Sequence, residues 1–263
     1  MTMQRLFAVV ILCLYAFAVR AAESQTFAHG GDARVDGTFI QAYKAKWKIT
    51  GRGKDGTVKD GGTWSDSVQV AKLHDRDVLR RAQVWNYGTG TETFVNFVDR
   101  KTLLPIITEF TNTQGIYYRF EYSADGRVVR YQRSPALKDD SAPYNISDPM
   151  EQGTVHLDVP VWDFNGGMFG LLIAAFPLQE GYAAKFPVFA VVDLSRHPAW
   201  VDFSVSDKAT VAAGPGKSVE AWNVVANSPA TKEVMRFALA KEPPYVIELR
   251  QEWQGLDWTF ELM

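Results

Sequence analysis

The sequence predicts a mainly β fold, a long curved antiparallel sheet or half-open β-barrel with one short apolar helix on its concave face. Aromatic residues are abundant, with 8 Trp, 10 Tyr and 16 Phe in 263 residues, and large flat side chains suit pleated, half-buried surfaces. Segments with two-residue alternation follow one another, divided by Gly, Pro, Asn and Asp. A closed barrel and a two-sheet sandwich are the alternatives.

The N-terminus has the pattern of a secretory signal peptide over residues 1–22. Arg5 gives the positive start, Leu6 to Val19 form an apolar run of 14 residues, and small residues stand before a cut near Ala22. A membrane span needs about 20 residues, so an uncleaved anchor is the weaker alternative. We therefore expect a periplasmic protein whose residues 23–37 form a flexible lead-in to one β domain, residues 38–263.

Charge and cysteine content exclude several classes of protein. The net charge of -2 gives no basic face to neutralise phosphates, so we expect no nucleic-acid partner. The only cysteine, Cys13, lies in the predicted signal peptide and would be lost on cleavage. The mature chain would then hold neither a disulfide nor a thiolate metal site, and we expect no metal and no cofactor.

The first strand pattern runs from Phe39 to Thr50. Tyr43, Trp47 and their alternate neighbours form an apolar face, while lysines occupy positions 44, 46 and 48. The charged, glycine-rich stretch that follows, residues 51–62, predicts a loop. Further strands are predicted at Val68–Leu73, Val78–Tyr87, Thr91–Val98, Leu104–Thr111, Val155–Val159, Tyr182–Val192, Val201–Val205, Val219–Ala226, Glu233–Ala240, Tyr245–Trp253 and Trp258–Leu262.

Two hairpins have enough pattern to predict their register. In Ile116 to Arg133, a type I′ turn at Asp125-Gly126 places Glu121 opposite Arg130. At the C-terminus, a turn at Gly255-Leu256 places Arg250 opposite Glu261. The alternative turn at Gln254-Gly255 sets like charges against each other, so we favour the first register.

The middle of the chain contains the one predicted helix. Residues 134–165 are polar and proline-rich and predict a long connection. Residues 166–176 (GGMFGLLIAAF) are apolar throughout and stop at Pro177, which indicates a short helix. A helix that is apolar on every side is buried or faces an apolar ligand.

No catalytic motif stands out. The glycines of residues 51–56 fit a dinucleotide fingerprint, and residues 214–218 resemble part of a phosphate-binding loop, but strands flank both and turns explain them better. A Gly-x-Ser-x-Gly elbow is absent. Scattered carboxylates leave a paired-acid hydrolase as an open alternative.

Two stretches resemble a group of exported bacterial proteins of unknown function. One is Asn96 to Pro105, with the pattern Val-Asp-x-x-Thr-Leu-x-Pro, and the other is Glu242-Pro243-Pro244-Tyr245. Such domains are similar in layout to the bacterial lipoprotein-sorting carriers, half-open β-barrels whose helices plug an apolar cavity. The resemblance implies that layout over residues 38–263 and supplies no catalytic residues. This chain shows one apolar helix where the carriers have several.

These observations favour a non-enzymatic periplasmic protein that binds or carries an apolar ligand such as a lipid or acyl chain. A structural or interaction module of the cell envelope is the alternative, and a carboxylate-dependent hydrolase comes third. An apolar pocket between the helix and the inward faces of the strands would be the site. Its predicted lining is Met168, Phe169, Leu172, Ile173, Phe176, Tyr118, Phe120 and Trp47.

Overall fold

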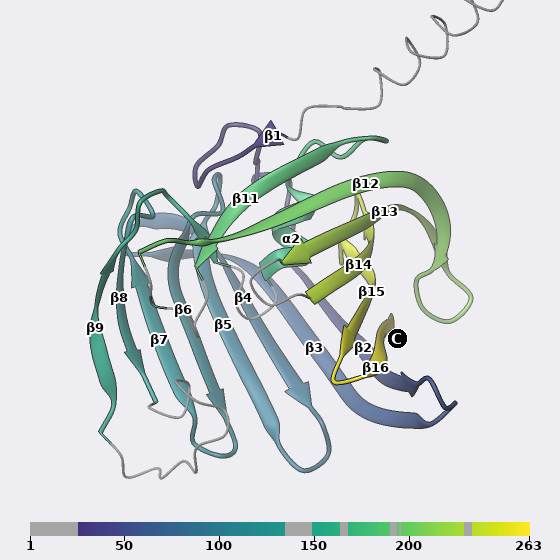
Figure 1. The fold of residues 1–263 in the computed structure, drawn as a ribbon. Coiled ribbons are helices and arrows are strands. Elements are labelled where there is room, and N and C mark those ends of the chain that lie inside the picture. Colours follow the sequence, from purple (N-terminus) through teal and green to yellow (C-terminus); the bar gives the residue numbers. More distant parts are fainter. Residues whose placement is uncertain (1–25, 135–148, 164–167, 190–193, 195, 229–232) are drawn as a thin grey trace, which may run out of the picture.

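A computed structural model describes residues 26–134, 149–163, 168–189, 194, 196–228 and 233–263. The strands form one large, open, strongly curved sheet, and helix α2 (Met168–Ala174) lies inside its curve (Figure 1). The mainly β fold with a single short helix among the described residues confirms the predicted fold class. The predicted signal peptide falls outside the described residues and stays a prediction.

Two runs of sequential antiparallel strands make up the sheet (Figure 1). The first contains β2 (Tyr43–Gly53), β3 (Val58–Leu73), β4 (Arg76–Asn86), β5 (Thr91–Asp99), β6 (Pro105–Asn112), β7 (Tyr117–Tyr122), β8 (Val128–Arg133) and β9 (Glu151–His156). The second contains β11 (Ala183–Phe189), β12 (Ala199–Ala212), β13 (Ser218–Ser228), β14 (Glu233–Ala240), β15 (Val246–Trp253) and β16 (Leu256–Leu262). The short strands β1 (Thr26–Phe27) and β10 (Trp162–Asp163) pair with β11 in parallel.

The two runs join where β16 pairs with β2. Phe260 lies opposite Ile49 and Trp258 opposite Gly51. Residues about 200 positions apart in the sequence therefore share one inward face, since cross-strand neighbours point to the same side of a sheet. This junction builds the candidate site described below.

The glycine-rich stretch between residues 51 and 62 is mostly strand, which corrects the predicted loop. β2 continues to Gly53 and β3 begins at Val58, so only a short turn separates them. The pairing register shifts between Ile49 and Thr50, and Gly62 has a φ of 83°. A glycine at positive φ lets a strand bulge and still continue, and so glycines need not end it. Residues 214–218, as predicted, turn from β12 into β13.

The hairpin of β7 and β8 has the predicted register, with Glu121 opposite Arg130. Its turn is not the predicted type I′ turn, because Gly126 has positive φ (69°) but Asp125 does not. The loop is wider: the Ser123 hydroxyl donates to the Asp125 carboxylate at 2.5 Å, and the Gly126 N–H donates to the Ser123 carbonyl at 2.9 Å. Hydrogen bonds within this loop thus stabilise a different turn, and the pairing of β7 with β8 has the predicted register.

The predicted register of the C-terminal hairpin is wrong. The turn is at Gln254-Gly255, with φ of 52° and 73°, so Glu248 lies opposite Glu261. The like charges are tolerated because β16 has neighbours on both sides. Lys48 of β2 stands opposite Glu261, and Arg250 donates to Glu248 at 2.6 Å. Opposite charges next to each glutamate offset the unfavourable pair.

The lead-in that the sequence predicts to be flexible is packed against the sheet from residue 26 onward. Ala28 and Val35 are at most 3% exposed, and the Gly37 N–H donates to the Lys101 carbonyl at 2.7 Å. Just after the lead-in, the phenol of Tyr245, in the Pro-Pro-Tyr stretch, accepts the Gln41 N–H at 2.9 Å. The few apolar residues of this polar segment are thus spaced to reach the core, which composition alone does not reveal.

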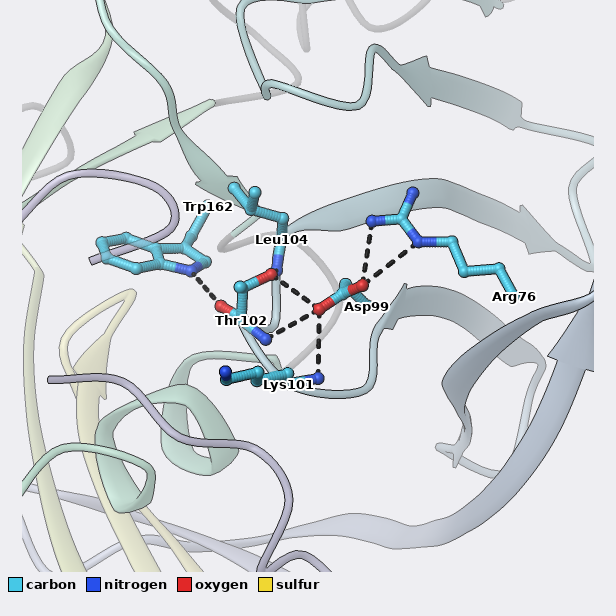
Figure 2. Close-up of polar contacts among 6 residues, drawn as sticks. All are labelled: Arg76, Asp99, Lys101, Thr102, Leu104 and Trp162. Carbon is cyan, nitrogen blue, oxygen red and sulfur yellow. Dashed lines mark hydrogen bonds and ion pairs between the residues drawn. The ribbon is translucent and has the colours of Figure 1, made fainter. Parts of the chain in front are cut away.

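The turn between β5 and β6 explains the Val-Asp-x-x-Thr-Leu-x-Pro pattern (Figure 2). The Asp99 carboxylate accepts hydrogen bonds from the N–H groups of Lys101 (3.0 Å) and Thr102 (2.8 Å). It also forms an ion pair with Arg76 (2.9 Å). The Trp162 indole N–H donates to the Thr102 carbonyl at 3.1 Å. Partial burial opposes ionisation of Asp99, but these hydrogen bonds outweigh it and lower its pKa. The pattern therefore has a structural role, holding a turn against the core.

Candidate functional site

An aromatic groove opens on the concave side of the sheet, where the two runs of strands meet. Its volume is about 240 Å³ and most of its surface is apolar. Its walls come from both ends of the chain, with β2 to β4 on one side and β14 to β16 on the other. The lining residues are Trp47, Ile49, Trp64, Arg81, Gln83, Trp85, Gly170, Phe237, Val246, Leu249, Gln251, Trp253, Trp258 and Phe260.

Strand register brings the aromatic rings of the groove together. Trp47 lies opposite Trp64, which in turn lies opposite Trp85. The ring centroid of Trp64 is 6.3 Å from that of Trp85 and 6.0 Å from that of Phe260. Aromatic pairs at such distances attract each other beyond their burial. The rings therefore form a continuous wall across the junction.

Three indole N–H groups of the groove donate to backbone carbonyls. Trp85 donates to Gly61 at 2.8 Å, Trp258 to Trp253 at 3.2 Å, and Trp47 to Ile247 at 3.3 Å. The polar edge of each ring is thereby satisfied within the protein. These bonds fix the orientation of the rings and leave their apolar faces for contact with a ligand.

Two glycines make room for the ring of Trp258. A Cβ atom on Gly51 would stand 2.9 Å from this ring, and one on Gly61 would stand 2.6 Å from it. Such separations are below van der Waals contact, so any larger residue would push the ring out of place. The glycines of the 51–62 stretch therefore shape the groove as well as the bulge.

A buried ion pair lies at the base of the groove. The Arg81 guanidinium donates to the Asp66 carboxylate at 2.7 Å, and both side chains are at most 4% exposed. The Tyr43 hydroxyl donates to the same carboxylate at 2.8 Å. Burial by itself would lower the pKa of Arg81, but the carboxylate outweighs it and raises the pKa above its ordinary value. Arg81 thus stays charged and paired with Asp66, and the two charges together add no net charge to the groove.

The polar side chains that line the groove are few. Among its described lining residues, only Arg81, Gln83 and Gln251 are polar apart from the indoles, and neither Asp nor Glu is present. In the described parts of the chain, no group of three or more His, Cys, Asp or Glu side chains is placed to hold a metal ion. The groove is therefore suited mainly to apolar contact, with a few polar side chains that can form hydrogen bonds.

Seven of the eight predicted ligand-binding residues lie in three places. Met168, Leu172, Ile173 and Phe176 are at most 4% exposed and pack in the main core between the helix and the strands. Tyr118 and Phe120 belong to a second buried cluster under β6 to β9. Trp47 lines the groove. The side chain of Phe169 lies outside the described part of the structure.

Sequence reasoning missed most of the groove. Gly170 is the helix residue that borders it, whereas the prediction put the helix at its centre. Trp64 and Trp85, which lie outside the predicted lining, also line the groove. Nothing in the sequence distinguishes Trp253 and Trp258 from ordinary strand residues. Their place in the groove follows only from the pairing of β16 with β2.

Three tyrosines inside the fold have strongly raised pKa values. Burial is the main cause for Tyr43, Tyr118 and Tyr122, and the nearby Asp163 carboxylate adds to it for Tyr118 and Tyr122. Burial removes the water that would stabilise a phenolate. These hydroxyls stay protonated in the folded protein at pH values where they ionise in the unfolded chain.

This difference predicts that the protein loses stability in alkali. Unfolded tyrosines release protons near pH 10, so above that pH the unfolded state is favoured by about 1.4 kcal/mol per pH unit for each buried tyrosine. Urea unfolding at pH values from 9 to 11 measures the slope. Tyr118→Phe should remove about one third of the contribution of these three residues. A free energy of unfolding that stays constant over this range would contradict the assignment.

Comparison with known proteins identifies one family. Residues 43–257 match the family described as a protein of unknown function (DUF3108). The matched segment spans β2 to the start of β16 and so includes nearly all of the groove. No curated protein and no solved structure matches the chain. Among the described residues, no helix has both the length and the apolar character needed to cross a membrane.

Proposed function

The chain belongs to the DUF3108 family, and from this premise we propose that it is a non-enzymatic protein that binds an apolar ligand, an acyl chain, in the aromatic groove. The observation that supports the proposal is the groove itself, where five tryptophans from both ends of the chain surround an open apolar cavity. Apolar pockets with a few polar groups are the usual sites for small ligands.

The size of the groove limits the ligand. A cavity of about 150 Å³ holds one benzene molecule, so about 240 Å³ has room for a hydrocarbon of about ten carbon atoms by the same proportion. The groove is open on one side, and Trp253 at its rim is 42% exposed. A polar head group can therefore remain in water while the chain contacts the rings. This supports a medium-length acyl chain.

The hydrolase alternative finds less support in the groove. Glycoside hydrolysis needs two carboxyl groups that face each other across the substrate, and the described lining residues include no carboxylate. The buried Asp66 is held by Arg81 and Tyr43.

We also propose, from the sequence pattern, that residues 1–22 are a cleaved signal peptide, that the protein is periplasmic, and that its layout is related to that of lipoprotein-sorting carriers.

Binding of decanoate tests the proposed function. In delipidated protein, decanoate should change the tryptophan fluorescence in a saturable way, because five indoles line the groove. Gln251→Trp puts a large ring into the groove and should weaken binding about tenfold or more, a loss of about 1.4 kcal/mol. Gln69→Trp makes the same change at an exposed position of β3 and should leave the affinity unchanged.

Two outcomes would contradict the proposal. One is wild-type protein that shows no saturable change with decanoate or with longer fatty acids. The other is Gln251→Trp protein that binds as tightly as wild type, since the ligand would then lie elsewhere. Native mass spectrometry of the same samples gives the stoichiometry, which we expect to be one acyl chain per protein.

A further inference from the structure

A second, wider groove lies on the opposite face of the sheet from the aromatic groove. On β2, Lys44 and Lys46 alternate with the inward-facing Trp47 and therefore point outward. The β12–β13 turn and the residues after β14 stand across from them, and the space between has a volume of about 1400 Å³. Its described lining includes Lys44, Lys46, Lys217 and Lys241, together with Ala82 and Val84.

Lysines on the walls carry charges that other side chains leave unmatched. All four lining lysines are exposed, and within the described structure none has a carboxylate within 4.0 Å. Of the three acidic residues in the lining, Asp66 points its side chain inward to Arg81 and Glu220 is paired with Lys208, which leaves Glu242. The side chains of this groove are therefore net positive, although the chain as a whole has a charge of -2.

The floor of this groove is small and apolar. Ala82 and Val84 of β4 lie beside Ser67 and Ser65 of β3, and Val84 is 37% exposed. Nearby, Ala240 and Ile247 belong to a buried apolar cluster. No aromatic side chain is present among the described lining residues. The floor therefore offers small apolar contacts and no aromatic ring on which a sugar could stack.

Shape distinguishes a membrane surface from a polypeptide as the anionic partner. A membrane surface is flat and would meet the exposed lysines more readily than Ser65, Ser67 and Ala82, which are only partly exposed. An extended peptide is narrow enough to enter the groove, and its alternate side chains can face the lysine walls and the apolar floor. Charge complementarity and shape together thus favour an acidic polypeptide.

We propose that the lysine-walled groove binds an extended acidic segment of a partner protein, with carboxylates against Lys44, Lys46, Lys217 and Lys241 and small apolar side chains on the floor. Positive walls opposite a negative segment speed association and fix its register. The proposal is independent of acyl binding, because the two grooves lie on opposite faces of the sheet.

Fluorescence anisotropy with the full chain tests this proposal. The probe is a labelled peptide of about ten residues in which Glu and Val alternate, so that one face is acidic and the other apolar. The variant Lys44→Gln/Lys217→Gln/Lys241→Gln should weaken binding about tenfold. A control variant, Lys54→Gln/Lys59→Gln/Lys101→Gln, removes the same charge from exposed lysines elsewhere and should bind as wild type does. Circular dichroism verifies that both variants are folded.

Three results would overturn the proposal. The first is no binding of the Glu-Val peptide up to about 1 mM at low salt. The second is equal weakening in both lysine variants, because binding would then follow net charge alone. The third is binding to vesicles that contain phosphatidylglycerol but not to the peptide, which would assign the lysines to a membrane surface. Selective loss in the groove variant supports the proposal.

Discussion

Replacing Asp66 with alanine should lower the free energy of unfolding by about 3–5 kcal/mol. The substitution leaves the guanidinium of Arg81, which is 3% exposed, buried without its counter-ion. It also takes away the acceptor of the Tyr43 hydroxyl. Removing one partner of a buried pair costs far more than the pair contributes, because the remaining charge has lost both water and its partner. Denaturant unfolding at neutral pH measures the change.

Two control proteins separate this effect from a general loss of charge. Asp77→Ala breaks the exposed pair between Lys72 and Asp77, whose side chains are 67% and 63% exposed, and should cost less than about 1 kcal/mol. The double variant Asp66→Leu/Arg81→Met replaces the buried pair with apolar groups and should recover most of the lost stability. If Asp66→Ala destabilised the protein no more than Asp77→Ala does, Arg81 would have to be hydrated in solution.

Local patterns in the sequence predicted the strands and their inward faces. The alternation of Lys44, Lys46 and Lys48 with Tyr43 and Trp47 gave the correct outer face of β2, because side chains alternate across any strand. The β7–β8 register was also correct, since a short loop leaves few ways to pair its flanking residues. In both cases the deciding interactions lie within about 20 residues of each other along the chain.

Long-range pairing was beyond local patterns. The groove depends on β16 lying against β2, and nothing in residues 256–262 indicates that choice of neighbour. The same pairing explains the wrong C-terminal register. Judged as an isolated hairpin, Glu248 opposite Glu261 is unfavourable, but Lys48 on the far side of β16 offsets it. Judging the charges within one pair of strands is therefore not enough when a strand, like β16, pairs with a second strand on its other side.

Buried polar groups were equally hard to predict. Asp66 and Arg81 stand in strands whose other residues read as ordinary alternation, and on sequence alone a charged residue is expected at the surface. Their burial follows from β3 pairing with β4, which brings the two side chains to one face at the base of the groove. The buried ion pair at the base of the candidate site therefore became visible only with the three-dimensional structure.

The helix is the point on which the proposed function and the sequence-based hypothesis differ most. The hypothesis places the ligand against Met168, Leu172 and Phe176, whereas the aromatic groove touches α2 at Gly170. A helix of seven residues is too short to be stable by itself, so its order depends on packing. This makes the contribution of its side chains to stability measurable separately from any contribution to binding.

Leu172→Ala should lower the free energy of unfolding by about 2–5 kcal/mol, because Leu172 is 1% exposed and its removal leaves a cavity in the main core. Under conditions where the variant is folded, it should bind decanoate with the affinity of wild type. Val70→Ala, at a position 53% exposed on β3, is the control and should change stability by less than about 0.5 kcal/mol. Denaturant unfolding and the decanoate titration together give both quantities. A Leu172→Ala protein that kept its stability but lost decanoate binding would return the ligand to the helix and contradict the groove assignment.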